Sequence, residues 1–317
     1  MAAEQAVPTG RVAPVTLEAS GLEVTPDEIR GLFEPFVAQT LAADDPTWRA
    51  EIRRRKRKLL RQAVERVLGR QRDKARVVEE YDRAWERIDY GMYALGRELR
   101  FVTPWVWRGR QMLASDAGAT RVRQLLLCRA IERLKPRRVL EVGCGNGINL
   151  ILLAGRFPEI AFTGVDLTEA GVRASQELQK RPALPDAMRA FAPLEVVDPT
   201  AFRRIAFHRG DAASLPFADA SFDLVCTVLA LEQMEQVRER ALAEIARTSA
   251  GHTLMIEPFA DVNADFWPRL NVFRRNYFRG SIAGLRAHGL EPELATADFP
   301  QEVFLKACLV LARKAAP

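Results

Sequence analysis

The chain has 317 residues, of which 48% are hydrophobic and 28% charged, and its formal net charge is +6 at neutral pH. This composition suffices for a buried core in one large domain or two smaller ones. No apolar run reaches the eighteen residues of a membrane span, and the first thirty residues lack the basic start and hydrophobic segment of an export signal. The four cysteines have neither metal-like nor redox-like spacing, so we expect reduced residues, no metal site and a cytoplasmic protein.

Residues 1–24 are rich in Ala, Val, Thr and Pro without a clear period, and we expect a flexible tail. A helix is predicted to begin at Thr25, because Thr25 can act as N-cap and Glu28 completes a capping box. Apolar residues continue at helical spacing as far as Leu41, with a kink or a break at Pro35. Residues 25–115 are therefore expected to form a helical, basic N-terminal domain, or lid.

A second predicted helix begins at Asp44-Asp-Pro46 and ends near Gly69, with a further helical stretch to about Glu98. Between Arg49 and Arg76 there are thirteen Lys and Arg and three acids, a local net charge of +10. Such a helix can bind RNA phosphates, anionic lipid head groups or an acidic partner, or it can be the solvated face of a lid. Residues 49–76 are a predicted polyanion site, which adds peripheral membrane binding to the localisations we consider.

Aromatic residues follow the basic helix, seven of them within the 27 positions from Tyr81 to Trp107. Aromatic walls are typical of ligand pockets, whereas packing between helices is the structural alternative. We select Tyr81 and Tyr90 as residues that line an acceptor pocket.

The segment from Val139 to Leu150 contains a predicted buried strand, three glycines and the start of a helix. Gly143, Gly145 and Gly147 permit turn conformations closed to other residues and let a ligand approach the backbone. Their spacing is G-x-G-x-G, whereas dinucleotide-binding loops have G-x-G-x-x-G. The loop predicts a nucleotide-like cofactor.

The segments downstream fit the same ligand. Asp166 ends the next predicted strand, nineteen residues after Gly147, where a carboxylate can accept hydrogen bonds from both ribose hydroxyls. Gly210-Asp211-Ala212 follows a third strand, and predicted strands over 221–228 and 253–258 come next. In this order and spacing, residues 120–317 resemble the class I S-adenosylmethionine-dependent methyltransferases with a type 11-like domain.

The resemblance implies a Rossmann-like α/β fold over residues 116–317, with seven mostly parallel strands of which the last is antiparallel. It also implies that S-adenosylmethionine is the cofactor, with Glu141 near its ammonium group, Asp166 on the ribose and Asp211 on the adenine amine. The remaining implied cofactor residues are Gly143, Cys144, Gly145, Gly147, Leu167, Ala212, Val228 and Leu229. An NAD-binding domain is the alternative, but it leaves Gly210-Asp211-Ala212 unexplained.

The end of the chain favours the methyltransferase reading. Residues 289–299 and 303–312 look like two strands joined by a short loop with Pro300 and Gln301. A short connection permits an antiparallel pair, whereas parallel strands need a crossover of about a dozen residues. An antiparallel last strand is what this methyltransferase family has.

Glu232 and Glu257 lie at the carboxyl ends of the fourth and fifth predicted strands. A buried carboxylate there can have a raised pKa and act as a general base, so both are catalytic candidates. For Glu257, hydrogen bonding to loop backbone is the alternative role. Arg274 and Tyr277, after the fifth strand, are candidates for acceptor binding, with a surface helix as the alternative.

We therefore expect a methyltransferase, a transferase that moves the methyl group of S-adenosylmethionine to an oxygen or nitrogen of a small-molecule or lipid-linked acceptor. The sequence lacks the Asn/Asp-Pro-Pro-Tyr/Phe signature and the Pro-Cys nucleophile of two groups of nucleic-acid methyltransferases. Two alternatives remain open at this stage. One is an RNA methyltransferase that uses the basic helix 49–76, and the other is a non-catalytic interaction protein that binds the cofactor.

Overall fold

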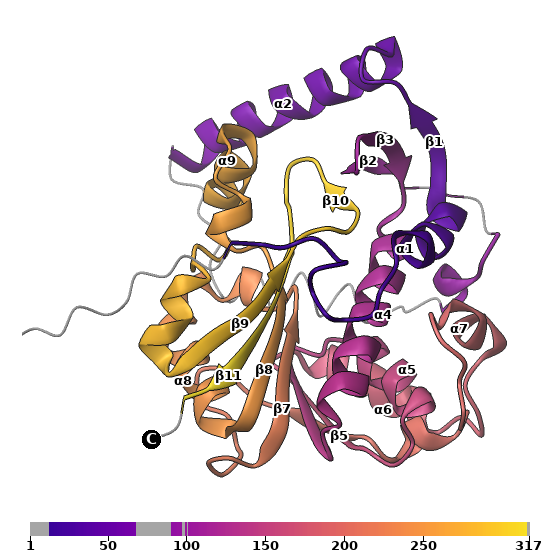
Figure 1. Ribbon diagram of the computed structural model, residues 1–317, viewed down its shortest axis with the longest axis vertical. Helices are drawn as coiled ribbons and strands as arrows, with labels where there is room; N and C mark the ends of the chain where they lie inside the picture. The colour runs from indigo at the N-terminus through magenta and orange to yellow at the C-terminus, as the bar shows by residue number, and fades with distance from the viewer. Residues whose placement is uncertain (1–12, 68–89, 97–98, 100, 316–317) are drawn as a thin grey trace, which may run out of the picture.

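The computed structural model describes residues 13–67, 90–96, 99 and 101–315 (Figure 1). Its centre is a seven-stranded sheet in the order β6-β5-β4-β7-β8-β11-β9. The strands are β4 (Arg138–Val142), β5 (Ala161–Asp166), β6 (Ala206–Arg209), β7 (Phe222–Val228), β8 (Ser249–Glu257), β9 (Leu290–Thr296) and β11 (Cys308–Lys314).

Within this sheet, β4 pairs in parallel with β5 and β7, and the parallel arrangement continues from β5 to β6 and from β7 to β8. The last strand, β11, lies between β8 and β9 and is antiparallel to both. The predicted fold class, a seven-stranded Rossmann-like sheet with an antiparallel last strand, is therefore confirmed for residues 116–317.

Helices cover both faces of the sheet. One apolar core contains side chains from α4, α5 and α6, and the other contains side chains from α8 and the short helix η7. The α-helices here are α4 (Asp116–Leu134), α5 (Ile148–Arg156), α6 (Glu169–Gln179), α7 (Asp186–Phe191), α8 (Arg238–Thr248) and α9 (Phe266–Arg275). The short 3-10 helices are η3 (Ala201–Arg204), η4 (Leu231–Gln233), η5 (Glu235–Val237), η6 (Ala260–Val262) and η7 (Ala283–His288).

The region 25–115 contains the helices α1 (Pro26–Phe33) and α2 (Pro46–Val67), and it also contains strands that the prediction of a helical domain did not include. A four-stranded sheet has the order β1-β3-β2-β10, with all its pairs antiparallel. Its last strand comes from the loop between β9 and β11, so the C-terminal part of the chain completes an N-terminal sheet. The strands are β1 (Val37–Leu41), β2 (Thr103–Trp107), β3 (Arg110–Ala114) and β10 (Gln301–Glu302).

The reason for this difference lies after Pro35. The capping box at Thr25 is present, but α1 (Pro26–Phe33) ends before Pro35 and is followed by the 3-10 helix η1 (Glu34–Phe36). Residues 37–41 then extend and pair with β3, because tertiary pairing overrides a weak helical pattern.

Residues 13–24 are packed against the sheet. For these residues the prediction of a flexible tail is therefore wrong. Leu17 and Leu22 are almost fully buried, and the Leu17 amide donates to the Asp298 carboxylate. Val15 forms a bridge with Thr296 at the edge strand β9. Leu17 and Leu22 anchor this segment, although they do not follow a helical or strand period. Hydrophobic periodicity therefore could not predict this packing.

The predicted basic helix is α2 (Pro46–Val67), which crosses one end of the molecule and contacts α9 (Figure 1). The rest of the predicted helical stretch to Glu98 lies largely outside the described residues, apart from the 3-10 helix η2 (Tyr90–Tyr93) and a few residues after it. Among the helices that the structure describes, none has the length and apolar character needed to cross a membrane.

Candidate functional site

A cavity of about 280 Å³ opens at the carboxyl ends of β4, β5 and β7. Open α/β sheets bind ligands at this edge, where the loops after neighbouring parallel strands meet. The lining residues come from α4 (Thr120, Arg123), from β4 to α5 (Glu141 to Asn146, Ile148, Asn149), from β5 (Val165 to Thr168), from Gly210 to Ala212, from Val228 to Ala230, from Gln233, Met234, Gln236 and Val237, and from α9 and its cap (Arg275, Asn276).

The glycine loop brings bare backbone to the cavity. Gly143 has φ of +76°, and a Cβ atom built on it would lie 2.4 Å from the Cβ of Ala230. Gly147, with φ of +74°, begins α5, and a Cβ there would lie 2.7 Å from the Phe207 ring. Both positions therefore need glycine for conformation and for space. The amides of Gly143 and Cys144 bond to the Val165 carbonyl, which ties the loop to β5.

Asp166 connects this loop to the next one. Its carboxylate accepts hydrogen bonds from the Gly145 amide (2.7 Å), the Thr168 amide (2.8 Å) and the Thr168 hydroxyl (2.6 Å). A carboxylate has about four acceptor positions, so three protein donors leave room for a ligand hydroxyl. Asp166 is only partly buried and lines the cavity.

Glu141 places a buried carboxylate at the same edge. Its Oε1 accepts from the Asn149 amide nitrogen at 2.5 Å, and Asn149 in turn accepts from Gln124. Its Oε2 is buried and has no hydrogen-bond partner among the residues that the structure describes. Burial raises the pKa of Glu141 to about 8, and the nearby Asp166 contributes to the rise. A cationic ligand group in the cavity would satisfy this oxygen and favour its charged form.

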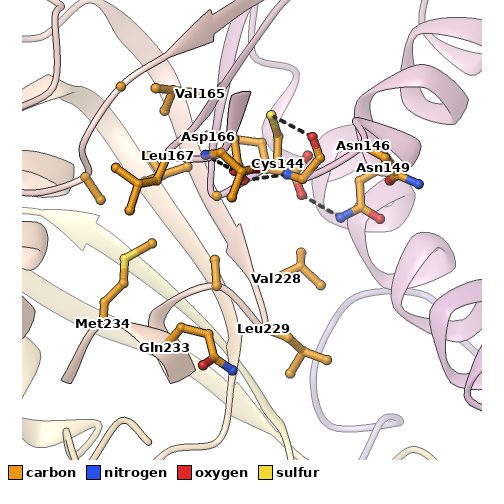
Figure 2. A pocket seen from close by; sticks show the side chains of 18 of the residues that line it. Cys144, Asn146, Asn149, Val165, Asp166, Leu167, Val228, Leu229, Gln233 and Met234 are labelled. Atoms are coloured by element: carbon orange, nitrogen blue, oxygen red, sulfur yellow. Dashed lines mark hydrogen bonds between the residues drawn. The ribbon is translucent and has the colours of Figure 1, made fainter. Parts of the chain in front are cut away.

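A second wall faces these loops (Figure 2). The figure shows Asp166, Cys144 and Asn149 on one side, and Leu229, Gln233 and Met234 across from them. Leu229 has φ of +52°, which is uncommon for a residue other than glycine, and its amide donates to the Ile256 carbonyl. Such strained backbone clusters at ligand sites.

Glu257 stabilises this second wall from behind. It is fully buried, and its Oε1 accepts from the amides of Ala230 (2.9 Å) and Leu231 (3.1 Å) while its Oε2 accepts from Glu232 (3.3 Å). Burial and the neighbouring Glu232 raise its pKa to about 8. Glu257 does not line the cavity. Its position therefore does not match the predicted role of general base and matches the alternative, bonding of loop backbone.

Glu232 also lies behind the cavity wall. It is buried, accepts from the Gln233 side chain at 2.9 Å, and has a pKa raised to about 7 by burial, against the attraction of Arg275. Arg275 donates to the Tyr277 hydroxyl at 2.5 Å and lines the cavity. The position of Glu232 does not match a catalytic base either, and its charge acts on Arg275.

Neither a reactive thiol nor a metal-binding cluster is found at this site among the described residues. Burial raises the pKa of Cys144 well above its ordinary value, so the thiol stays protonated and its small size is what the loop uses. Among the described residues, no three His, Cys, Asp or Glu side chains are arranged to hold a metal ion.

The structure brings ten of the eleven predicted cofactor residues to one cavity. Gly147 is the exception, since it shapes the helix start without lining the cavity. The lining residues that were not predicted are Thr120, Arg123, Val142, Asn146, Ile148, Asn149, Val165, Thr168, Gly210, Ala230, Gln233, Met234, Gln236, Val237, Arg275 and Asn276. Asn149 had a usable signal, because a residue in the first turn after the glycine loop faces the same edge as the loop.

The predicted acceptor residues fare differently. Tyr81 and the side chain of Tyr90 lie outside the described residues. Tyr277 is buried and Arg274 donates to Asn271, and neither lines the cavity. Arg275 lines it instead, one residue further along α9. The helical phase of α9 decides this choice, and it depends on packing against α2 and on the hydrogen bond from Asn271 to the Phe304 carbonyl, which the sequence does not show.

Comparison with known protein families identifies residues 140–252 as matching the family described as "Methyltransferase domain". This match runs from β4 into β8 and includes the glycine loop, Asp166 and Asp211. Curated relatives include phthiotriol/phenolphthiotriol dimycocerosates methyltransferase of Mycobacterium tuberculosis, 33% identical over 111 residues, which are 35% of this chain and 33% of that protein. Norajmaline N-methyltransferase of Rauvolfia serpentina is 28% identical over 130 residues, 41% and 38% of the two chains. The chain thus spans little more than a third of the length of these relatives.

Solved structures with a similar course of chain include the YcgJ protein of Bacillus subtilis, with a TM-score of 0.43 and 19% identity over 61% of this chain and 98% of that one. The [4+2]-cyclase SpnF has a TM-score of 0.47 and 18% identity, covering 76% and 97% of the two chains.

Proposed function

We propose that the protein transfers the methyl group of S-adenosylmethionine to an oxygen or nitrogen of a small-molecule or lipid-linked acceptor, since residues 140–252 match the methyltransferase domain family. The observation that carries the proposal is the cavity at the ends of β4, β5 and β7, with its glycine loop and the buried Glu141 Oε2, which lacks a partner within the described part of the chain.

The residues of the cavity fit this cofactor. Glu141 would hold the ammonium group, because its Oε2 needs a partner and its burial makes an opposite charge favourable. Asp166 would accept a hydrogen bond from a ribose hydroxyl, and Asp211 with Ala212 would bind the adenine. The backbone of the glycine loop and of Val228 and Leu229 would surround the methionine part. These roles agree with the walls that each residue lines.

Bound there, the cofactor supplies a methyl group that its sulfonium already activates. The protein then has to align the acceptor with that methyl group and exclude water. Leu229 and Met234 provide apolar surface on the second wall, and Gln233 provides an amide that can orient a polar acceptor.

The charge distribution narrows the acceptor chemistry. Among the described lining residues, the acids Glu141, Asp166 and Asp211 all belong to the wall of the glycine loop. The second wall has Arg123 and Arg275 as its cations, and among its described lining residues there is no acid or histidine. This arrangement favours an amine that arrives unprotonated, or an acidic hydroxyl whose anion Arg275 stabilises, over an alcohol that needs a strong base.

The names of the relatives support an acceptor that is not a macromolecule. One group of relatives is named for phthiotriol dimycocerosates and another for the N-methylation of norajmaline. Both names fit a small-molecule or lipid-linked acceptor, and they leave oxygen and nitrogen open for this chain.

The first test is cofactor binding by calorimetry. Asp166→Ala should weaken binding of S-adenosylmethionine by about 10-fold to 100-fold, the effect of losing one charge-assisted hydrogen bond. Asp198→Ala is a matched control, since Asp198 accepts from the amide and hydroxyl of Thr200 just as Asp166 does from Thr168, but away from the cavity. Equal affinities for the two variants would overturn the cofactor assignment.

The second test identifies the acceptor. The protein is incubated with labelled S-adenosylmethionine and a fractionated cell extract, and mass spectrometry locates the labelled product. We expect the label in a small-molecule or lipid fraction. Label in RNA would replace our acceptor class, and no S-adenosylhomocysteine from any fraction would favour a non-catalytic protein.

A further inference from the structure

Helix α2 has one face that is bound to the protein. Its side chains Trp48, Leu59 and Ala63 are buried. Lys56 lies 4.9 Å above the Trp267 ring of α9, and Arg55 lies 3.6 Å from Glu302 of β10. The helix is therefore held in a defined orientation, and its opposite face is defined as well.

The opposite face is basic. Exposed cations lie along it, and acids on the helix are few: Glu51 is paired with Arg54 and Arg55, and Glu65 lies 3.8 Å from Arg61. We call this surface the outward face of α2, defined by Arg53, Arg54, Arg57, Lys58, Leu60, Arg61 and Val64, all of which are exposed.

Two large aliphatic side chains lie among these cations. Leu60 is 46% exposed and Val64 is 58% exposed. They are one helical turn apart, and at 100° per residue they lie with Arg53 along one side of the outward face, next to Arg57. A solvated charged face has no need of two adjacent exposed aliphatic residues, whereas a surface that inserts shallowly into lipid does.

We propose that the outward face of α2 docks the protein on an anionic lipid bilayer, with Leu60 and Val64 entering the interface and the surrounding cations contacting lipid phosphates. Charge complementarity supports this partner, because basic clusters on amphipathic helices are attracted to negatively charged membrane surfaces. RNA fits less well. Proteins bind single-stranded RNA through aromatic side chains on which bases stack, and none of the outward-face residues is aromatic.

The docking helix is bonded to the rim of the cavity. Arg66, near the end of α2, donates to the Phe273 carbonyl and to the Asn276 side chain, and Asn276 lines the cavity. Docking through α2 would hold this rim next to the bilayer. This inference rests on the proposed function and makes the acceptor more specific. A lipid-linked acceptor would reach the cavity from the membrane surface.

The experiment is co-sedimentation of the full chain with vesicles. We expect binding to vesicles of phosphatidylcholine with 30% phosphatidylglycerol to be at least about 100-fold stronger than binding to pure phosphatidylcholine, and to weaken as salt rises. Equal binding to both, or to neither, overturns the proposal.

Two sets of variants separate charge from insertion. Arg53→Glu, Arg57→Glu and Arg61→Glu together should weaken binding to the anionic vesicles by more than about 100-fold. The control, with the same change in net charge, is Arg137→Glu, Arg203→Glu and Arg240→Glu, three exposed residues outside α2, and it should lose much less. Leu60→Ser with Val64→Ser should weaken vesicle binding by at least about tenfold.

The control measurements keep the outcomes distinct. If the Leu60→Ser, Val64→Ser variant binds vesicles as tightly as the unchanged protein, the proposed insertion into lipid is wrong. If the protein binds RNA more tightly than vesicles, and the three arginine substitutions abolish this binding, the partner is RNA and the proposed membrane docking is wrong. Circular dichroism checks that each variant folds. Calorimetry with S-adenosylmethionine separates the two proposals, because loss of vesicle binding with intact cofactor affinity contradicts only the docking, and the reverse contradicts only the proposed function.

Discussion

The two walls of the cavity are built in different ways. The wall of the glycine loop consists of backbone and short side chains at the ends of the adjacent strands β4 and β5, with Asp166 bonding one loop to the other. The facing wall consists of longer side chains from three places: α4, residues 228–237 and α9. The first wall follows from a few neighbouring residues, whereas the second depends on how separate elements pack.

This difference suggests a division of tasks. The first wall consists of backbone, glycines and carboxylates that are hydrogen-bonded to neighbouring groups. Because its geometry allows little change, it suits a ligand that is the same in every reaction, such as the cofactor. A wall made of side chains such as Gln233, Met234 and Arg275 can be altered residue by residue without disturbing the sheet. We therefore expect substitutions in the first wall to affect the cofactor and substitutions in the second wall to affect the acceptor.

The largest effect is expected for Gly143→Val. The variant forces a branched side chain to φ of +76° and into the Ala230 methyl group, so cofactor affinity should fall more than about 1000-fold. Gly289→Ala is the control, because Gly289 has φ of +71° but nothing within 4 Å of its Cβ position. It should cost about 1 kcal/mol of stability and leave cofactor affinity unchanged in calorimetry. Similar affinities for both variants would contradict the close packing of the two walls.

A substitution behind the second wall tests its support. Glu257→Ala leaves three buried amides without an acceptor, so the free energy of unfolding should fall by roughly 3 kcal/mol or more in urea denaturation. Glu293→Ala removes a surface carboxylate that pairs with Arg313, and its cost should stay below about 1 kcal/mol. Retained stability in the Glu257 variant would show that the 230–232 turn has other support.

Arg275→Ala tests the second wall itself. If Arg275 binds the acceptor, KM for the acceptor should rise by about 10-fold to 30-fold, as expected for the loss of one charge-assisted hydrogen bond. The affinity for S-adenosylmethionine should stay within about twofold. Arg274→Ala, at the neighbouring position off the cavity, is the control and should change neither quantity. A weakened cofactor with unchanged acceptor KM would reverse the assignment of the two walls.

The smallest effect is a pH dependence of the first wall. The pKa of Glu141 in the free protein is raised to about 8, and a bound ammonium group should lower it. Because the complex favours the ionised carboxylate, affinity for S-adenosylmethionine should rise from pH 6 to pH 7.5, by at most about tenfold per pH unit. Glu141→Gln should flatten this slope. Glu232→Gln, which changes a buried acid off the cavity, should retain it, and a slope that survives in the Glu141 variant would exclude Glu141 as its source.

Much of the first wall could be predicted from the sequence. Gly143, Asp166 and Asp211 each follow a segment whose own residues predict a strand. Their positions could therefore be inferred from short stretches of sequence. Parallel strands place their carboxyl ends at one edge of a sheet, so the meeting of these residues needs no knowledge of side-chain packing. The antiparallel β11 followed in the same way from the short connection that precedes it.

The N-terminal region could not be predicted to the same extent. Residues 37–41 have apolar spacing that fits a helix, but β3 supplies the hydrogen bonds that make them a strand. Residues 301–302 form β10 by pairing with β2, about 195 positions earlier in the chain. Leu17 and Leu22 are anchored by a core that contains residues from most of the chain. Each of these outcomes depends on a distant partner.

The sequence by itself determined the fold class, the glycine loop and the carboxylates at the strand ends, because these depend on local conformation and on the order of strands. Only the tertiary structure decided that Glu257 bonds to a turn, that Arg275 rather than Arg274 lines the cavity, and that Leu60 and Val64 remain exposed among arginines. Those three outcomes depend on which face of an element is packed. Burial is a property of the assembled molecule, and helical spacing alone does not specify which side a neighbour will cover.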